Sequence, residues 1–115
     1  MKRLTLVLLT AVALSAFAAD TSVQGYLVDI ACASEDGQRA NFGVKHSKEC
    51  LQMPDCERSG YGVLTDDKKV IPFDAASNAK AKQFIADLKK EKNIKVSVTG
   101  AMNGDKMAVT RIELQ

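Results

Sequence analysis

Three cysteines and a single histidine, residue types that readily bind soft metals, occur in this sequence of 115 residues. His46, Cys50 and Cys56 fall within eleven residues, Met53 lies between the two cysteines, and Cys32 precedes them all. Thiolates with an imidazole form the Cys3His set that binds zinc, whereas thiolates with a thioether suit copper(I). These residues therefore predict a soft-metal site that binds zinc or copper.

The same three cysteines, Cys32, Cys50 and Cys56, allow two other interpretations. In an oxidising compartment two of them would form a disulfide that staples a long loop to the domain. The third would be buried or would join two chains in a disulfide-linked dimer. A thiol-redox protein, in which one cysteine attacks and another resolves, is the further alternative, although no Cys-x-x-Cys pair is present. The sequence leaves the pairing open.

Catalytic chemistry has little support in the sequence. A lone His46 with scattered serines and carboxylates does not define a nucleophile and its base. No Cys-x-x-Cys-His motif for haem attachment occurs either. We therefore expect no catalytic residue and interpret the chain as a small non-enzymatic binding or accessory domain, with a ligand or protein partner still to be identified.

Two short helical turns are predicted to position the cysteines on either side of Pro54. Ser47 is a suitable N-cap for the first turn, which should end near Met53 because a residue before proline disfavours helical geometry. The second turn, residues 55–59, should be stopped by Gly60. The break matters because residues six apart in one helix are separated by about 9 Å along its axis, too far for a disulfide.

The connection that precedes His46 is polar and lacks a sustained period over residues 33–44, which predicts a long surface loop. Asp29 lies near the end of the preceding apolar run. We interpret it as a cap of the loop rather than as a ligand, because aspartate readily bonds to neighbouring backbone.

Five strands and one longer helix account for the rest of the chain. Runs of β-forming residues predict strands over residues 22–32, 61–65, 69–73, 94–102 and 106–114. Apolar residues at helical spacing predict an amphipathic helix from Asp74 or Ser77 to about Lys92. In the last strand the apolar residues change from odd to even positions, which predicts either a bulge near Thr110 or a strand that changes its buried face.

This order of elements predicts a mainly β fold, a small five-stranded OB-like Greek-key barrel. One helix would lie between the third and fourth strands, and a helical insertion containing the cysteines between the first and second. A small α+β sheet with one covering helix fits the same order and is the alternative. No repeat or linker interrupts the sequence, so residues 19–115 are expected to form a single domain.

The N-terminus predicts export. Lys2 and Arg3 precede an apolar run over residues 4–17, and Ala16-Phe17-Ala18 supplies the small residues of a cleavage site. Residues 1–18 are therefore interpreted as a secretory signal peptide, which would place the domain in the periplasm or outside the cell. An uncleaved anchor is the competing interpretation, but the run is shorter than the roughly 20 residues that span a bilayer. We expect no membrane attachment after cleavage.

Removal of the signal peptide would also neutralise the chain. Of 16 basic residues, Lys2 and Arg3 would be lost, which leaves 14 basic and 14 acidic residues. Nucleic-acid binding depends on a basic face that neutralises phosphates. The charge balance therefore predicts no nucleic-acid partner.

Several of these motifs together resemble a group of small exported bacterial proteins. The resemblance rests on Gly25-Tyr26-Leu27-Val28-Asp29 and Cys32, on the His-x3-Cys-x2-Met-x2-Cys motif of residues 46–56, and on Ser59-Gly60-Tyr61-Gly62. It covers nearly the whole of residues 19–115. The expected architecture is also similar to that of exported bacterial OB-fold proteins that act as ligand-binding modules. The resemblance implies an exported single domain and brings no assigned activity with it.

Overall fold

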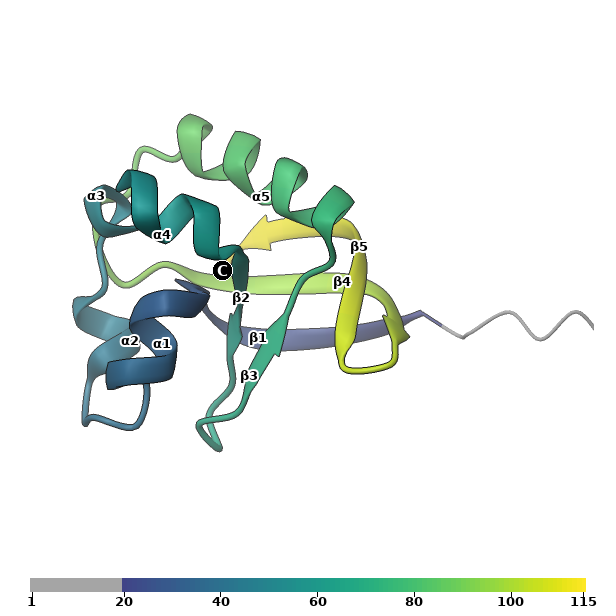
Figure 1. Ribbon diagram of the computed structural model, residues 1–115, viewed down its shortest axis with the longest axis horizontal. Coiled ribbons are helices and arrows are strands. Elements are labelled where there is room, and N and C mark those ends of the chain that lie inside the picture. The colour runs from purple at the N-terminus through teal and green to yellow at the C-terminus, as the bar shows by residue number, and fades with distance from the viewer. Residues whose placement is uncertain (1–19) are drawn as a thin grey trace, which may run out of the picture.

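Figure 1 shows the computed structural model of the protein, which describes residues 20–115. The predicted signal peptide, residues 1–18, lies outside the described residues. None of the helices within residues 20–115 combines the length and the apolar character needed to cross a membrane.

A five-stranded antiparallel sheet forms the framework of the molecule (Figure 1). Its strands are β1 (Thr21–Asp29), β2 (Tyr61–Leu64), β3 (Val70–Pro72), β4 (Lys95–Asn103) and β5 (Lys106–Leu114). They lie in the order β3-β2-β1-β4-β5. The central strand β1 pairs with β4 along its first part and with β2 along its last part, and the two ladders overlap at Tyr26. The mainly β class predicted from the sequence is therefore confirmed.

The sheet is open, so the OB-like barrel predicted from the sequence is not confirmed. Its edges are β3 and β5, which approach each other where Phe73 forms a parallel bridge with Met107. The Asp74 backbone N–H donates to the Met107 carbonyl at 3.0 Å next to this bridge. Strand β3 has few free backbone groups with which β5 could form further hydrogen bonds, because it has three residues and Pro72 has no backbone N–H.

The hairpin of β4 and β5 shows how apolar parity sets the buried face. Buried and half-buried residues alternate along most of β4, as expected for a strand with one face in the core. Thr99 pairs with Arg111 and Gly100 with Val109, so Thr110 is an extra residue in the ladder. The bulge, one of the two arrangements predicted at this point, is confirmed. Met107 and Val109 before it are buried and Ile112 after it packs against the core, whereas Leu114 is 45% exposed.

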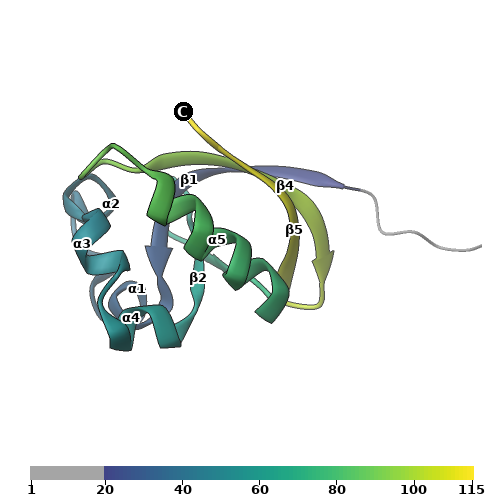
Figure 2. The same ribbon diagram turned by 90° about the horizontal axis from the view of Figure 1, so that it is seen from above.

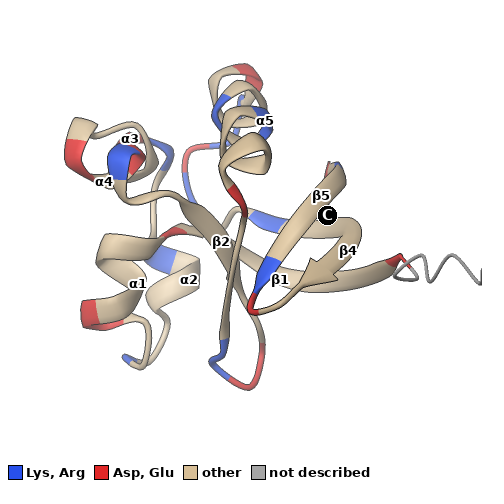
Figure 3. Cartoon of the chain, turned by 45° about the vertical axis from the view of Figure 1, so that its right-hand side comes forward, with Lys and Arg blue, Asp and Glu red and all other residues tan. Residues whose placement is uncertain are grey.

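Helix α5 (Ala75–Asp87) lies across one face of the sheet (Figure 2). Asp74 caps its N-terminus by accepting a hydrogen bond from the Ser77 backbone N–H at 2.9 Å. Basic and acidic residues are interspersed on its outer surface (Figure 3). The helix ends at Asp87 rather than near Lys92, because Leu88 adopts an extended backbone and is buried in the core.

Four short helices connect β1 to β2 and gather at one end of the sheet (Figures 1 and 2). They are α1 (Ile30–Asp36), α2 (Phe42–Lys45), α3 (Lys48–Leu51) and α4 (Pro54–Ser59), and we call residues 30–59 the helical segment. The strand predicted to reach Cys32 is therefore wrong beyond Asp29, and the loop predicted over residues 33–44 is confirmed only for residues 37–41, between α1 and α2. The two turns predicted around Pro54 are confirmed as α3 and α4.

One apolar core joins the sheet, α5 and the helical segment. It contains Leu27, Val63, Val96, Ile85 and, from α3, Leu51, all with at most 1% of their surface exposed. The Tyr61 hydroxyl donates to the Leu51 carbonyl at 2.8 Å, so the start of β2 also fixes α3. Burial of one leucine contributes roughly 2 kcal/mol, so Leu51 anchors α3 to this core. Ala33 of α1 packs in a second buried cluster with Val28 and Leu64.

Candidate metal centre

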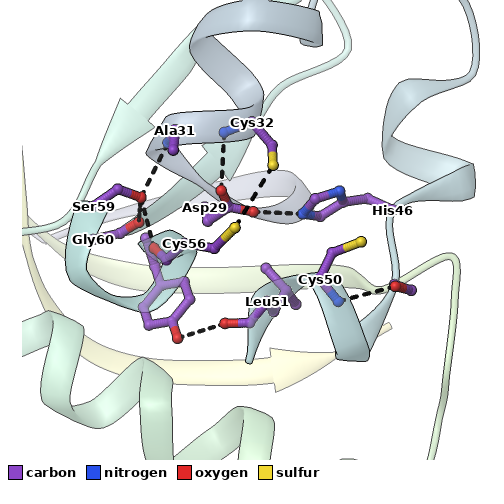
Figure 4. A network of polar contacts seen from close by, with 11 residues as sticks. Asp29, Ala31, Cys32, His46, Cys50, Leu51, Cys56, Ser59 and Gly60 are labelled. Carbon is purple, nitrogen blue, oxygen red and sulfur yellow. Dashed lines mark hydrogen bonds and ion pairs between the residues drawn. The ribbon is translucent and has the colours of Figure 1, made fainter. Parts of the chain in front are cut away.

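Asp29 stands at the junction of β1 and α1, where its side chain is completely buried. One carboxylate oxygen, Oδ2, accepts a hydrogen bond from the Cys32 backbone N–H at 2.9 Å and so begins α1. The other oxygen, Oδ1, lies 2.7 Å from Nε2 of His46 (Figure 4). An ionised carboxylate only accepts hydrogen bonds, so the His46 Nε2 carries the proton and donates it.

Cys32 of α1 and Cys56 of α4 face each other beside this carboxylate (Figure 4). Their sulfur atoms are 3.8 Å apart. One ligand atom each from Asp29, Cys32 and Cys56 lies within 4.8 Å of the other two. Two thiols and a carboxylate, all at least partly removed from solvent, are thereby directed at one small volume.

Hydrogen bonds between α1 and the end of α4 fix the separation of the two thiols. The Ile30 backbone N–H donates to the Gly60 carbonyl at 2.9 Å, and the Ala31 N–H donates to Ser59 Oγ at 3.0 Å. Ser59 Oγ donates in turn to the Cys56 carbonyl at 2.6 Å (Figure 4). The backbone of Cys56 is therefore tied to the start of α1, within one turn of Cys32.

Within the cluster, the pKa of the carboxyl is lowered and the pKa values of the thiols are raised. Burial opposes ionisation of Asp29, but the hydrogen bonds from His46 and Cys32 outweigh it and lower the pKa of this carboxyl to about 2. Burial, reinforced by the neighbouring Asp29, raises the pKa of Cys32 to about 12 and also raises the pKa of Cys56. Without a cation the thiols therefore stay protonated at neutral pH, whereas a bound divalent ion would favour the thiolates.

His46 is held in place from two sides. It ends α2, where its backbone N–H donates to the Phe42 carbonyl at 2.9 Å, and it is 7% exposed. The Phe42 ring packs against the imidazole with centroids 4.9 Å apart. His46 thus reaches the cluster through its hydrogen bond to Asp29.

Cys50 lies near the cluster but outside the group of three ligand atoms. Figure 4 shows its sulfur on the His46 side, apart from the sulfurs of Cys32 and Cys56. Its backbone N–H donates to Ser47 Oγ at 3.1 Å, which is the predicted cap of α3. Cys50 and His46 both line a cavity of about 270 Å³ that opens beside the cluster.

Met53, the thioether of the predicted ligand set, is not brought to the cluster. Its side chain is 51% exposed in the break between α3 and α4. It borders a surface groove with Lys48 and Pro54 instead. Among the five predicted ligands, the structure thus joins Cys32 and Cys56 directly, joins His46 through Asp29, and leaves Cys50 and Met53 apart.

Asp29 is the member of the cluster that the sequence interpretation treated only as a cap. The capping role is confirmed by the bond from Cys32, but the same carboxylate also holds His46 and faces both thiols. The available signal was a carboxylate at the end of an apolar run, three residues before a cysteine. A buried carboxylate must be paired, so its polar partners had to be sought elsewhere in the chain.

A scan of family models, a search of curated proteins and a search of solved structures gave no match to this chain. The chemistry of the site must therefore be argued from its geometry.

Proposed function

We propose that the chain is a small metal-binding domain that holds a zinc ion between α1 and α4. Cys32 and Cys56 would supply two thiolates, and Asp29 a carboxylate oxygen. The supporting observation is the distance of 3.8 Å between the two sulfur atoms. Two thiolates bound to one tetrahedral zinc at about 2.3 Å each lie about 3.8 Å apart, whereas bonded disulfide sulfurs are only about 2.05 Å apart.

The donor types favour zinc over copper. A carboxylate beside two thiols is a mixed oxygen and sulfur set, which zinc accepts readily. Copper(I) prefers thiolates and thioethers, but Met53 is half exposed and lies away from the cluster. The copper alternative therefore loses the residue that suggested it.

A tetrahedral ion needs a fourth donor, and two side chains are in position to provide it. His46 already contacts Asp29, and Cys50 lines the same cavity as His46. If His46 keeps its bond to Asp29, it would orient the carboxylate, as partners of metal ligands commonly do. Rotation of the Cys50 side chain would then complete a set of three thiolates.

The thiol-redox alternative is supported less well by the same residues. Attack on a disulfide requires a thiolate, and the pKa of Cys32 is raised to about 12 by burial and by Asp29. A pair poised for catalytic redox work would have a lowered pKa on one cysteine. Metal binding uses the same pair without this obstacle, because the ion itself displaces the protons.

We also propose that the domain is a partly open OB-like barrel that works after export. The bridge between Phe73 and Met107 brings the end of β3 beside β5. Four of the strands lie in the order β4-β1-β2-β3, which is a Greek key, as in that fold. The basic and apolar N-terminus of the sequence supports export to the periplasm or beyond.

The test is zinc binding by the reduced chain lacking residues 1–18, measured by native mass spectrometry and by competition with a chromophoric chelator. We expect one zinc per chain. Cys32→Ser and Cys56→Ser should each lower the zinc affinity at least about 100-fold, because each removes a ligand. Absence of zinc from the reduced wild-type protein would refute the proposal.

Cys50→Ser and His46→Ala identify the fourth donor in the same assay. The variant that removes it should lose about tenfold or more in affinity, and the other should lose less. Cobalt(II) in place of zinc reports the number of bound thiolates through its sulfur charge-transfer absorption. Equal affinity of Cys32→Ser and the wild type would show that the ion binds elsewhere.

A further inference from the structure

We infer that the Cys32–Cys56 pair closes to a disulfide on exchange with small-molecule disulfides and thereby releases its metal. This inference rests on the proposed metal site and adds a regulation to it. The pair is suited to this reaction because the two sulfurs are already 3.8 Å apart and both cysteines are free thiols.

Little backbone movement is needed to form the bond. The sulfurs must approach from 3.8 Å to about 2.05 Å, a shift that side-chain rotation can supply. Each cysteine lies in the first turn of its helix, and the helix ends are already tied by the bonds of Ile30 to Gly60 and of Ala31 to Ser59. The disulfide would therefore join two segments that are in place before the reaction.

The exposure of the two cysteines indicates which sulfur reacts first. Cys32 is partly exposed, whereas Cys56 is 7% exposed. A small disulfide RSSR reaches Cys32 first, and the Cys32 thiolate attacks one of its sulfurs and expels one RS⁻. The Cys56 thiolate then attacks the Cys32 sulfur of this mixed disulfide and expels the second RS⁻.

The overall reaction balances as one RSSR and two metal-bound thiolates giving one protein disulfide, two RS⁻ and the free ion. RSSR is reduced by two electrons, and the two cysteine sulfurs are oxidised by two. When the disulfide has formed the ion has lost both of these sulfur ligands, which leaves the carboxylate of Asp29 as its remaining ligand in the group of three. A carboxylate and the fourth donor hold zinc much more weakly than a set that includes two thiolates, so release follows from bond formation.

Cys50, which lies beside the cluster, can be compared with the Cys32–Cys56 pair. It is also a partly exposed free thiol, but its sulfur stands apart from the other two (Figure 4). In the metal-free protein, a small disulfide that reacts with Cys50 should therefore stop at the mixed disulfide, because no neighbouring thiol is in contact to resolve it. The sulfur–sulfur distance of 3.8 Å thus explains why Cys32 and Cys56 should form a disulfide with each other, whereas Cys50 should form only a mixed disulfide.

The experiment treats zinc-loaded Cys50→Ser protein with oxidised glutathione and follows zinc release with a chromophoric chelator. Intact mass and peptide mapping of the same samples identify the sulfur products. We expect zinc release to rise in step with a Cys32–Cys56 link and to reverse on addition of dithiothreitol and zinc. Cys56→Ser, introduced into the Cys50→Ser protein and treated in the same way, should accumulate glutathione on Cys32.

Zinc that stays bound while the oxidant is consumed would overturn the inference, as would a stable glutathione adduct on Cys32 of the Cys50→Ser protein. Failure of the metal proposal is recognised earlier, since no zinc would be present before oxidant is added. In that case the exchange is judged by mass alone. A Cys32–Cys56 link then supports the exchange step, and its absence overturns it.

Discussion

Two aspartates, Asp29 and Asp74, begin helices in the same way but have different surroundings. Each accepts a hydrogen bond of 2.9 Å from the backbone N–H three residues later, at Cys32 and Ser77 respectively. Asp74 is half-buried at the start of α5, and its partners are those of a simple cap. Asp29 is fully buried, and its second oxygen holds His46.

The two aspartates differ in what surrounds the capping carboxylate, and this difference makes only Asp29 part of a candidate metal site. Both pKa values are lowered, but Asp74 owes this to hydrogen bonds from Ser77, whereas Asp29 overcomes the cost of burial through His46 and Cys32. The local role therefore comes from the residue type and its place before a helix. The chemistry comes from burial and from the thiols that the fold packs beside one of the two carboxylates.

The largest difference between the two aspartates should appear in stability. In metal-free protein, Asp29→Ala should lower the free energy of unfolding by about 3 kcal/mol, because it removes a helix cap and leaves His46 without its buried partner. Asp74→Ala should cost less, because solvent can replace the cap. Urea unfolding followed by circular dichroism measures both, and equal losses would break the comparison.

The pH dependence of stability should separate them next. A carboxyl whose pKa is lowered on folding stabilises the folded state above its unfolded pKa and loses this contribution as pH falls toward the folded value. The pKa of Asp29 falls from 3.8 to about 2, which corresponds to about 2 kcal/mol. Metal-free wild type should therefore lose about that much more stability than Asp29→Asn between about pH 4 and pH 2.

Asp74→Asn is the matched control for this titration. The pKa of Asp74 is lowered as well, so its contribution also disappears on acidification, but we expect a smaller difference from wild type. Urea unfolding at several pH values provides the data. Parallel curves for wild type and Asp29→Asn would show that the buried carboxylate is not stabilised by its partners.

Zinc affinity tests the same pair of residues in the loaded protein. Asp29→Asn should lower the affinity at least about tenfold, whether the carboxylate is a ligand or orients one. Asp74→Asn should leave it within about twofold, since α5 contributes nothing to the cluster. Chelator competition gives both values, and a loss in Asp74→Asn would indicate a general effect of charge.

The smallest effect is expected at Met53. Because its side chain is half exposed and apart from the thiols, Met53→Leu should leave zinc affinity unchanged and stability within about 0.5 kcal/mol. A marked loss of copper(I) or zinc affinity would restore this thioether to the ligand set.

Much of the sheet could be predicted because strand patterns are local. The strand predicted over residues 106–114 coincides with β5, and the one predicted over residues 94–102 is displaced from β4 by a single residue. The bulge at Thr110 followed from a change of apolar parity. Whether the sheet closes depends on contacts between segments that are distant in the sequence, such as the Phe73–Met107 bridge. A local pattern does not predict such contacts.

The site was harder to predict because its partners are distant in the sequence. Ile30 and the residues after it continue the apolar pattern of β1, so only the cap made by Asp29 reveals that a helix begins there. Cys50 and Met53 are closer to Cys56 in sequence than Cys32 is. Packing of α1 on α4 nevertheless selects Cys32, and the break at Pro54 turns the nearer side chains away.

The shared position of β1 also bears on the order in which the molecule assembles. Its first residue in the sheet, Thr21, pairs with Gly100, whereas Asp29 pairs with Tyr61. Contacts between residues far apart in the chain form slowly, because a long loop must close first. The pairing of β1 with β2, which brings α1 beside α4, thus closes a shorter loop than the pairing of β1 with β4. The helical segment completes its contacts only with residues 88–93, since the Lys48 backbone N–H donates to the Glu91 carbonyl and the Asn93 N–H to the Val44 carbonyl. An ion captured once α1 meets α4 would therefore stabilise an early part of the fold.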